Sequence, residues 1–133
     1  MKVYLAGGMK SNCVEMLRVM IAARGHDLLD PATWQDSDPD IYTERDLKAI
    51  RECDAVLAFM DSSNPSGYGM SLEIGYAHAL GKRIVFLDWI YDDWRSRYFG
   101  MVRSVADVVC SREADALDLL SGPEVDRAAK EEV

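Results

Sequence analysis

Cysteine and histidine are scarce in this chain, and neither falls in a spacing that is typical of a metal site. The cysteines are Cys13, Cys53 and Cys110, and the histidines are His26 and His78. The cysteines lie far apart and form no CxxC pair, which favours reduced thiols in a cytoplasmic protein over a disulfide framework. We therefore expect no structural or catalytic metal ion, and we expect a cytoplasmic location.

Positive charge is also in deficit. Lys and Arg total 15 against 23 Asp and Glu, so the formal net charge is −8. An acidic chain repels the phosphate backbone of DNA or RNA, and no broad basic stretch is present to release counterions. We therefore expect no polymeric nucleic acid as partner. A nucleoside or a phosphorylated small molecule remains compatible, because its site needs only a few well-placed donors.

No long hydrophobic run occurs among the 133 residues. A membrane-spanning helix needs about 20 predominantly apolar residues, and the N-terminal stretch MKVYLAGG is too short for the core of a signal peptide. We therefore expect no membrane association. The length suits one domain, which we place at residues 1–120, followed by a polar tail over residues 121–133.

Short apolar segments alternate with segments of helical periodicity along the chain. The apolar segments are typical of buried strands and lie at residues 2–7, 26–31, 55–61, 83–88 and 105–111. Helices are predicted at 12–24, 42–54, from the glycine-rich turn to residue 81, and at 111–120, with a loop at 32–40 and an irregular or helical segment at 89–100. This alternation predicts a three-layer α/β fold with about five parallel strands and right-handed crossovers.

In such a fold, ligands bind beyond the carboxyl ends of the strands, where the strand order reverses. This rule selects the loops that follow Leu5, Met60 and Leu87. The GxGxxG pattern of dinucleotide-binding sites is absent from these loops, so a dinucleotide cofactor has little support.

One carboxylate, Glu73, lies close to the start of an apolar helix in the segment SGYGMSLEIGYAHALGK, residues 66–82. An acid in a first helical turn can simply interact with the helix dipole. Helical phase favours a functional role instead, since Glu73 lies on the side of Ala77, away from the polar stripe between Ser71 and Lys82. A carboxylate on a covered face must be paired or lie in a ligand site, so we interpret Glu73 as a nucleophile or base.

Asp46 and Tyr4 are candidates for the same site. Asp46 follows Thr43 by three residues and is equally well explained as the acid of a capping box at a helix start. Its helix leads into the strand before Glu73, so two carboxylates could share one site, one as nucleophile and one as proton donor. Tyr4 is either a core aromatic or a phenol that donates a hydrogen bond to Glu73.

Glycine and serine residues of two loops are candidates for substrate binding. These residues are Gly7, Gly8, Ser66, Gly67, Gly69 and Ser71. The glycines either form tight turns or let the backbone approach a ligand closely. The serines either donate hydrogen bonds to a sugar or phosphate, or cap a turn and a helix.

Three arginines, Arg95, Arg97 and Arg103, stand out in an acidic chain. They either form a solvated face that pairs with Asp92 and Asp93, or contribute with the neighbouring aromatic residues to a subunit contact.

Three segments resemble the nucleoside 2-deoxyribosyltransferases and the related nucleoside 5′-monophosphate N-glycosidases. They are KVYLAGGM (2–9), YTERDLKAIRECDAVLAFMD (42–61) and PSGYGMSLEIGYAHALGKRIVFL (65–87). The resemblance covers about the first ninety residues, and the glycine-rich turn followed by EIGYAHALGK is its most specific part. Within the first segment, Met9 joins the two glycines as an expected substrate contact.

The resemblance implies a role for each candidate side chain. Glu73 corresponds to the nucleophile that attacks the anomeric carbon and holds a covalent deoxyribosyl intermediate. Asp46 corresponds to the aspartate that assists protonation of the departing base, and Tyr4 to the tyrosine that orients the nucleophile. The resemblance also implies a flavodoxin-like fold, no metal or organic cofactor, and a homodimer or larger homo-oligomer in which a neighbour's C-terminal segment helps to close the site.

One segment departs from the transferases, which usually carry an aspartate shortly before the glutamate. Ser66 or Gly67 lies nearest to that position here, and the monophosphate glycosidases are more similar in this segment. We expect a nucleoside 2-deoxyribosyltransferase that moves the sugar of a 2′-deoxynucleoside to another nucleobase. The alternatives are a 5′-monophosphate N-glycosidase that releases free base and sugar phosphate, and a non-catalytic nucleotide-binding module.

Overall fold

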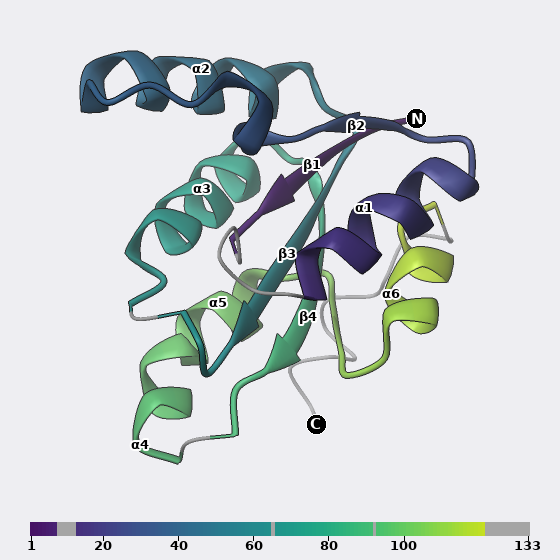
Figure 1. Ribbon diagram of the computed structural model, residues 1–133. Helices are drawn as coiled ribbons and strands as arrows, with labels where there is room; N and C mark the ends of the chain where they lie inside the picture. The colour runs from purple at the N-terminus through teal and green to yellow at the C-terminus, as the bar shows by residue number, and fades with distance from the viewer. Residues whose placement is uncertain (8–12, 65, 92, 122–133) are drawn as a thin grey trace.

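The computed structural model describes residues 1–7, 13–64, 66–91 and 93–121, and these residues form a central sheet between two layers of helices (Figure 1). The predicted tail, residues 121–133, lies outside the described residues except for Ser121.

The sheet has five parallel strands in the order β2-β1-β3-β4-β5. Their bounds are Lys2–Ala6 (β1), Asp27–Leu29 (β2), Ala55–Asp61 (β3), Arg83–Trp89 (β4) and Val108–Cys110 (β5). This order is that of flavodoxin-like folds, and the chain reverses direction across the sheet at β1 and β3. The fold class predicted from the sequence is therefore confirmed.

Two helices cover one face of the sheet and three cover the other (Figure 1). The first face carries α1 (Cys13–Ala23) and α6 (Glu113–Leu119); the second carries α2 (Pro39–Glu52), α3 (Tyr68–Ala79) and α5 (Gly100–Val105). Three short elements complete the described structure: the 3-10 turns η1 (Pro31–Trp34) and η2 (Arg97–Phe99), and α4 (Asp93–Ser96).

Each face of the sheet packs into its own hydrophobic cluster. Val3, Leu5 and Leu57 point toward α1 and α6, whereas Tyr4 and Val56, on the alternate positions, point toward α2 and α3. We call the second group the α2/α3 cluster. Residues Ala55 to Met60 of β3 are all buried, since helices cover both faces of this central strand.

The segment between β2 and β3 differs from its prediction. The sequence predicts a loop at residues 32–40, but η1 occupies the first part and α2 begins at Pro39. The Asp38 side chain caps α2 by accepting a hydrogen bond of 2.9 Å from the amide of Asp40, and proline suits the first helical position because it has no amide to satisfy. The capping box of Thr43 and Asp46 is therefore wrong, because both residues lie inside the helix.

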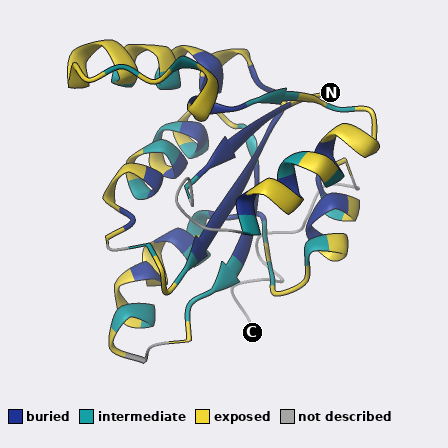
Figure 2. Cartoon of the chain, viewed as in Figure 1, coloured by how far each residue is buried: buried dark blue, intermediate teal, exposed yellow. Residues whose placement is uncertain are grey.

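Helix α2 is the most exposed of the long helices (Figure 2). Only Ala49 and Ile50 of its residues are buried, and they pack into the α2/α3 cluster. At its end, the Lys82 ammonium donates to the carbonyls of Arg51 and Cys53 at 2.9 and 2.8 Å, which satisfies acceptors that a helix end leaves free.

The predicted partners of the three arginines, the side chains of Asp92 and Asp93, lie outside the described part of the chain, so this pairing stays a prediction. Arg103 donates a hydrogen bond to Asp88 at 2.7 Å, and Arg97 is exposed.

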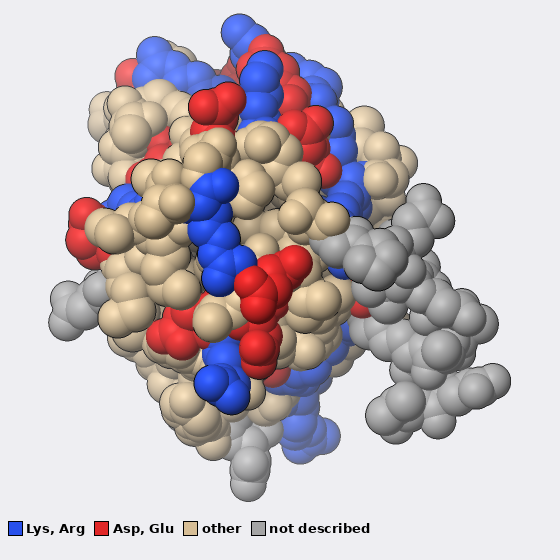
Figure 3. Space-filling view, turned by 90° about the vertical axis from the view of Figure 1, so that its right-hand side faces the viewer, with Lys and Arg blue, Asp and Glu red and all other residues tan. Residues whose placement is uncertain are grey.

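Charge is mixed on the surface seen in Figure 3, where basic and acidic side chains lie next to one another. This face offers no extended basic patch to a nucleic-acid backbone. None of the helices in the described residues has both the length and the apolar composition needed to span a bilayer. Nor does any group of three or more potential metal ligands occur among those residues.

Gly7 directly after β1 provides a test of the close packing between the carboxyl ends of β1 and β3. Its φ is +84°, and a β-carbon there would lie 2.4 Å from the carbonyl oxygen of Phe59. We expect Gly7→Ala to lower the free energy of unfolding by about 3 kcal/mol, since a strained backbone and a backbone clash add together. Gly25→Ala is the matched control, because Gly25 has a φ of +78° and a β-carbon there would have no atom within 4 Å.

For Gly25→Ala we expect a cost of about 1 kcal/mol from backbone strain alone. Urea denaturation of both variants measures the difference. Equal losses would show that close packing at Gly7 contributes nothing.

Candidate functional site

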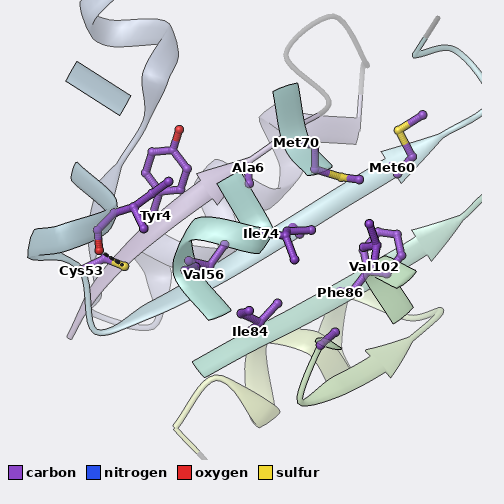
Figure 4. Close-up of a cluster of buried hydrophobic side chains, with 14 of the residues drawn as sticks. Tyr4, Ala6, Cys53, Val56, Met60, Met70, Ile74, Ile84, Phe86 and Val102 are labelled. Carbon is purple, nitrogen blue, oxygen red and sulfur yellow. Dashed lines mark hydrogen bonds between the residues drawn. The ribbon is translucent and has the colours of Figure 1, made fainter. Parts of the chain in front are cut away.

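Tyr4 extends from β1 into the α2/α3 cluster. Its ring is fully buried, and its hydroxyl points away from the labelled aliphatic side chains of the cluster (Figure 4). The hydroxyl donates a hydrogen bond to Oε2 of Glu73, which lies 69 residues further along the chain. A buried phenol needs such a partner, so β1 and α3 are joined here by a polar contact within an apolar layer.

Glu73 lies in the second turn of α3, not in the first as the sequence predicts, because the helix begins at Tyr68. Its neighbours Met70, Ile74 and Ala77 are buried against the sheet, which places Glu73 beside the covered face of the helix. The helix dipole acts mainly on the first turn, so it does not explain the carboxylate at this position.

The surroundings of Glu73 make ionisation costly. Burial raises the pKa of Glu73 to about 7, the hydrogen bond from Tyr4 acts in the opposite direction, and the charge of Asp46 raises it further. Burial and the adjacent Glu73 carboxylate also raise the pKa of Tyr4, so the phenol stays protonated and remains a donor. Glu73 is therefore divided between its neutral and ionised forms near neutral pH.

Asp46 projects from α2 and is half-buried. Its Oδ1 accepts a hydrogen bond of 2.7 Å from the indole Nε1 of Trp34 in η1. Burial raises the pKa of Asp46, and the bond from Trp34 opposes that change. Since its charge acts on both Glu73 and Tyr4, Asp46 belongs to the same group of side chains.

Two carboxyl groups in unlike surroundings thus lie within electrostatic reach of each other beside β1, at the reversal of the sheet order. The Glu73 carboxyl accepts a hydrogen bond from the Tyr4 phenol, and the Asp46 carboxyl accepts one from the Trp34 indole. Such a pair can divide labour between a nucleophile and a proton donor. The sequence identifies Tyr4, Asp46 and Glu73 as candidates. It gives no role to Trp34, which falls in the predicted loop at residues 32–40.

The loop candidates lie at the carboxyl ends of β1 and β3. Gly7 approaches the first turn of α3, where a β-carbon on Gly7 would lie 3.2 Å from the side chain of Met70. Gly67 has a φ of +76°, and a β-carbon there would lie 2.7 Å from the ring of Phe99, so both positions require glycine. Gly8 and Met9 lie outside the described residues.

The remaining candidates are less constrained, and two of them, Gly69 and Ser71, lie in the first turns of α3 rather than in the loop before it. Gly69 is exposed, and a β-carbon at this position would have no atom within 4 Å. Ser66 is exposed, and its amide donates to Oδ1 of Asn64 at 3.2 Å. The Ser71 hydroxyl donates to the Gly67 carbonyl at 3.0 Å, a bond that stabilises the helix start.

Arg95 organises the loop between β3 and α3, a role that the sequence does not predict. Its Nη1 donates to the carbonyls of Ser62 and Asn64 at 3.0 and 2.6 Å, and its guanidinium lies 5.1 Å from the ring centroid of Trp94. The sequence shows only an arginine next to a tryptophan. The two carbonyls that Arg95 binds are 31 and 33 residues away, and backbone atoms leave no signal in the sequence.

Solved structures with this fold include enzymes that act on nucleosides and nucleotides. A 2-deoxyribosyltransferase from Bacillus psychrosaccharolyticus superposes with a TM-score of 0.72 at 16% identity, covering 89% of this chain and 91% of the other. A CMP N-glycosidase from Clostridium botulinum superposes with a TM-score of 0.60 at 27% identity, covering 89% of this chain and 96% of the other. A 2-deoxyribosyltransferase from Leishmania mexicana gives a TM-score of 0.55 at 24% identity, covering 68% of this chain and 65% of the other.

No curated protein sequence matches the chain significantly. The family model for nucleoside 2-deoxyribosyltransferase, however, matches residues 3–105, a range that includes Tyr4, Asp46 and Glu73. The match extends from β1 to the end of α5 and thus covers most of the fold. The chain belongs to the nucleoside 2-deoxyribosyltransferase family.

Proposed function

We propose that this protein is a nucleoside 2-deoxyribosyltransferase, in which Glu73 attacks the sugar and Asp46 protonates the departing base. The observation that carries the proposal is the Glu73 carboxyl group, held by the Tyr4 hydroxyl and lying within electrostatic reach of Asp46. The family match supports the same assignment, because it spans all three residues. The substrate is a small molecule, a 2′-deoxynucleoside, and the acceptor is a free nucleobase.

The first step exchanges one bond at the anomeric carbon for another. Oε1 of ionised Glu73, the oxygen that does not accept the bond from Tyr4, forms a bond to C1′ while the bond between C1′ and the base nitrogen breaks. The electron pair of the broken bond stays on the base, which takes the proton from Asp46. The product is a deoxyribosyl ester of Glu73 and a neutral free base.

The second step reverses these roles. A ring nitrogen of the incoming base attacks C1′, loses its proton to Asp46, and displaces the Glu73 carboxylate. Two inversions at C1′ give net retention of configuration. Tyr4 keeps Oε2 occupied throughout, so that the same oxygen of Glu73 faces the sugar in both steps.

The loops beside the carboxylates supply the proposed substrate contacts. Gly7, Gly8 and Met9 follow β1, whereas Ser66, Gly67, Gly69 and Ser71 follow β3. The two loops approach each other where Gly7 meets Met70 of α3. Backbone amides in such loops can bind sugar hydroxyls at close range.

A second candidate function is hydrolysis of a nucleoside 5′-monophosphate to free base and sugar phosphate. Two observations favour it: the CMP N-glycosidase shares 27% identity over 96% of its length, and Ser66 lies close to the position where the transferases carry an aspartate. Water would then attack the Glu73 ester in place of a base, and the first step would be unchanged.

We further propose a homo-oligomer in the cytoplasm. Tyr68 of α3, Tyr98 of η2 and Met101 of α5 are exposed by 83, 77 and 83% in the single chain. Large apolar side chains exposed to this extent are typical of surfaces that are covered by another subunit.

Product analysis tests the reaction. The protein is incubated with a 2′-deoxynucleoside or its 5′-monophosphate, each with and without a second base, and the products are separated by chromatography. A new nucleoside supports transfer, and free base from the monophosphate alone supports hydrolysis. We expect Glu73→Ala to abolish turnover, by at least about 10³-fold, while the circular dichroism spectrum is retained. Product from neither substrate would refute both enzymatic functions.

Tyr4→Phe tests how the nucleophile is held. Loss of the phenolic donor destabilises ionised Glu73 and raises its pKa above about 7. The acidic limb of the kcat/KM profile should therefore move to higher pH, by about 1 pH unit if the bond contributes about 1.5 kcal/mol. Tyr76→Phe is the control: Tyr76 lies on α3 together with Glu73, but its hydroxyl contacts Arg51 and not Glu73. An equal displacement in both variants would contradict this role of Tyr4.

Glu73→Gln tests the cost of the buried carboxylate. The pKa of Glu73 in the fold, about 7, lies above its ordinary value of 4.5, so ionisation destabilises the folded protein as pH rises through this interval. The neutral amide avoids this cost. The free energy of unfolding of Glu73→Gln minus that of the wild type should increase as pH rises from 4.5 to 7. The total increase should be about 3 kcal/mol, and the difference should stay constant at higher pH.

Denaturant titrations at a series of pH values measure this difference. Glu52→Gln, an exposed position on α2, controls for the loss of a negative charge. A difference for Glu73→Gln that is independent of pH would show that Glu73 is not destabilised by burial.

A further inference from the structure

The turn η1 joins β2 to the site and is bound to the fold at its beginning. The Asp30 side chain accepts the amide of Ala32 at 3.0 Å, and the Asp30 carbonyl accepts the hydroxyl of Thr33 at 2.8 Å. Arg18 from α1 donates to the second oxygen of the same carboxylate at 2.5 Å. The first residues of η1, which lead to Trp34, are therefore held by contacts that do not involve α2.

Trp34 in turn contacts two consecutive residues of α2. Its carbonyl accepts a hydrogen bond of 3.0 Å from Nη1 of Arg45, and its indole Nε1 donates to Oδ1 of Asp46 at 2.7 Å. Its ring packs against the α2/α3 cluster. The only buried residues of α2 are Ala49 and Ile50, so Trp34 supplies polar contacts at the level of Asp46 that core packing does not supply.

An indole N–H is a donor only, with no acceptor lone pair in the ring plane. The indole therefore cannot accept a hydrogen bond from a protonated Oδ1. Within the described residues, Oδ2 accepts no hydrogen bond. When Asp46 is protonated, the bond from the indole favours the proton on Oδ2, because the carbonyl-type oxygen of a carboxylic acid is the stronger acceptor and Oδ1 is the oxygen that accepts.

We infer that Trp34 is the positioning residue of the proton donor: its indole holds Oδ1 of Asp46, so that the proton for the departing base is delivered from Oδ2. This inference rests on the proposed function, in which Asp46 supplies that proton. Trp34 does not touch the reacting atoms in this scheme. It determines which oxygen of Asp46 carries the proton and in which direction it points.

The groups that face Asp46 come from three elements: Trp34 of η1, Glu73 of α3 and Tyr4 of β1. Arg45 precedes Asp46 on its own helix and is bonded to the Trp34 carbonyl. Burial raises the pKa of Asp46 and the indole opposes that change, so loss of the indole should raise this pKa further. Asp46 would then stay protonated to higher pH, although its orientation would be lost.

Trp34→Phe provides the kinetic test, because it removes the N–H and keeps an aromatic ring. With a 2′-deoxynucleoside and a free base as substrates, we expect kcat to fall about tenfold and the alkaline limb of the kcat profile to move to higher pH. Arg45→Ala is the matched control, since it removes the other bond between η1 and α2 and leaves the indole in place. We expect its alkaline limb to coincide with that of the wild type.

A measurement on the wild-type protein makes the test independent of whether Trp34→Phe folds. The indole N–H signals are followed by ¹H–¹⁵N NMR from pH 3 to 9. The Trp34 signal should shift with the titration of Asp46, whereas that of Trp89, which donates to the Ser111 carbonyl at 2.7 Å, serves as the internal reference. The Asp46→Asn variant should abolish the shift.

The outcomes separate the inference from the proposed function. Suppose that the wild type forms product. If the alkaline limb of its kcat profile coincides with that of Trp34→Phe, Trp34 does not position Asp46. The same conclusion holds if the indole N–H signal of Trp34 does not shift with pH. If the wild type forms no product from any nucleoside or nucleotide, the proposed function fails and the catalytic role of Trp34 fails with it.

Discussion

The hydrogen bond between Tyr4 and Glu73 is the interaction on which the site depends. It is the polar contact that lets a carboxyl group remain in an apolar layer, where an isolated charge would be too costly. The bond does not cancel the cost of burial, since the pKa of Glu73 stays at about 7. The fold thus holds a carboxylate that is less stable than one in water, and such a group has more to gain from forming an ester with a sugar.

The sheet order brings the partners of Glu73 together. Because the strand order runs β2-β1-β3-β4, the segments that follow β2 and β3 both cover the same face of the sheet (Figure 1). Tyr4 points toward this face. Helix α3 delivers Glu73, α2 delivers Asp46, and η1 delivers Trp34. The well-packed α3 and the exposed α2 differ in how they are held, so the position of Asp46 relies more on individual hydrogen bonds than that of Glu73 does.

Much of the fold could be predicted because its signals are local. The continuous apolar run from Ala55 to Met60 indicates a central parallel strand, and the structure has this strand with the same bounds up to Asp61. The predicted start of α2 is wrong, because Thr43 and Asp46 fit a capping box while Asp38 and Pro39 fit a helix start a few residues earlier, and only the latter pair begins the helix. Both patterns satisfy short-range rules, and local sequence does not rank them.

The sequence by itself determined the alternation of strands and helices, the family motif around Glu73, and the identity of the three candidate side chains. These follow from periodicity and spacing within short segments, and from the motif that these segments share with the family. The tertiary structure alone decided that Asp46 binds the indole of Trp34, that Arg95 holds the loop before α3, and that Glu73 is only partly ionised near neutral pH. The reason is physical: hydrogen bonds and desolvation depend on distances in space, and the residues concerned are separated by 12 to 69 positions in the chain.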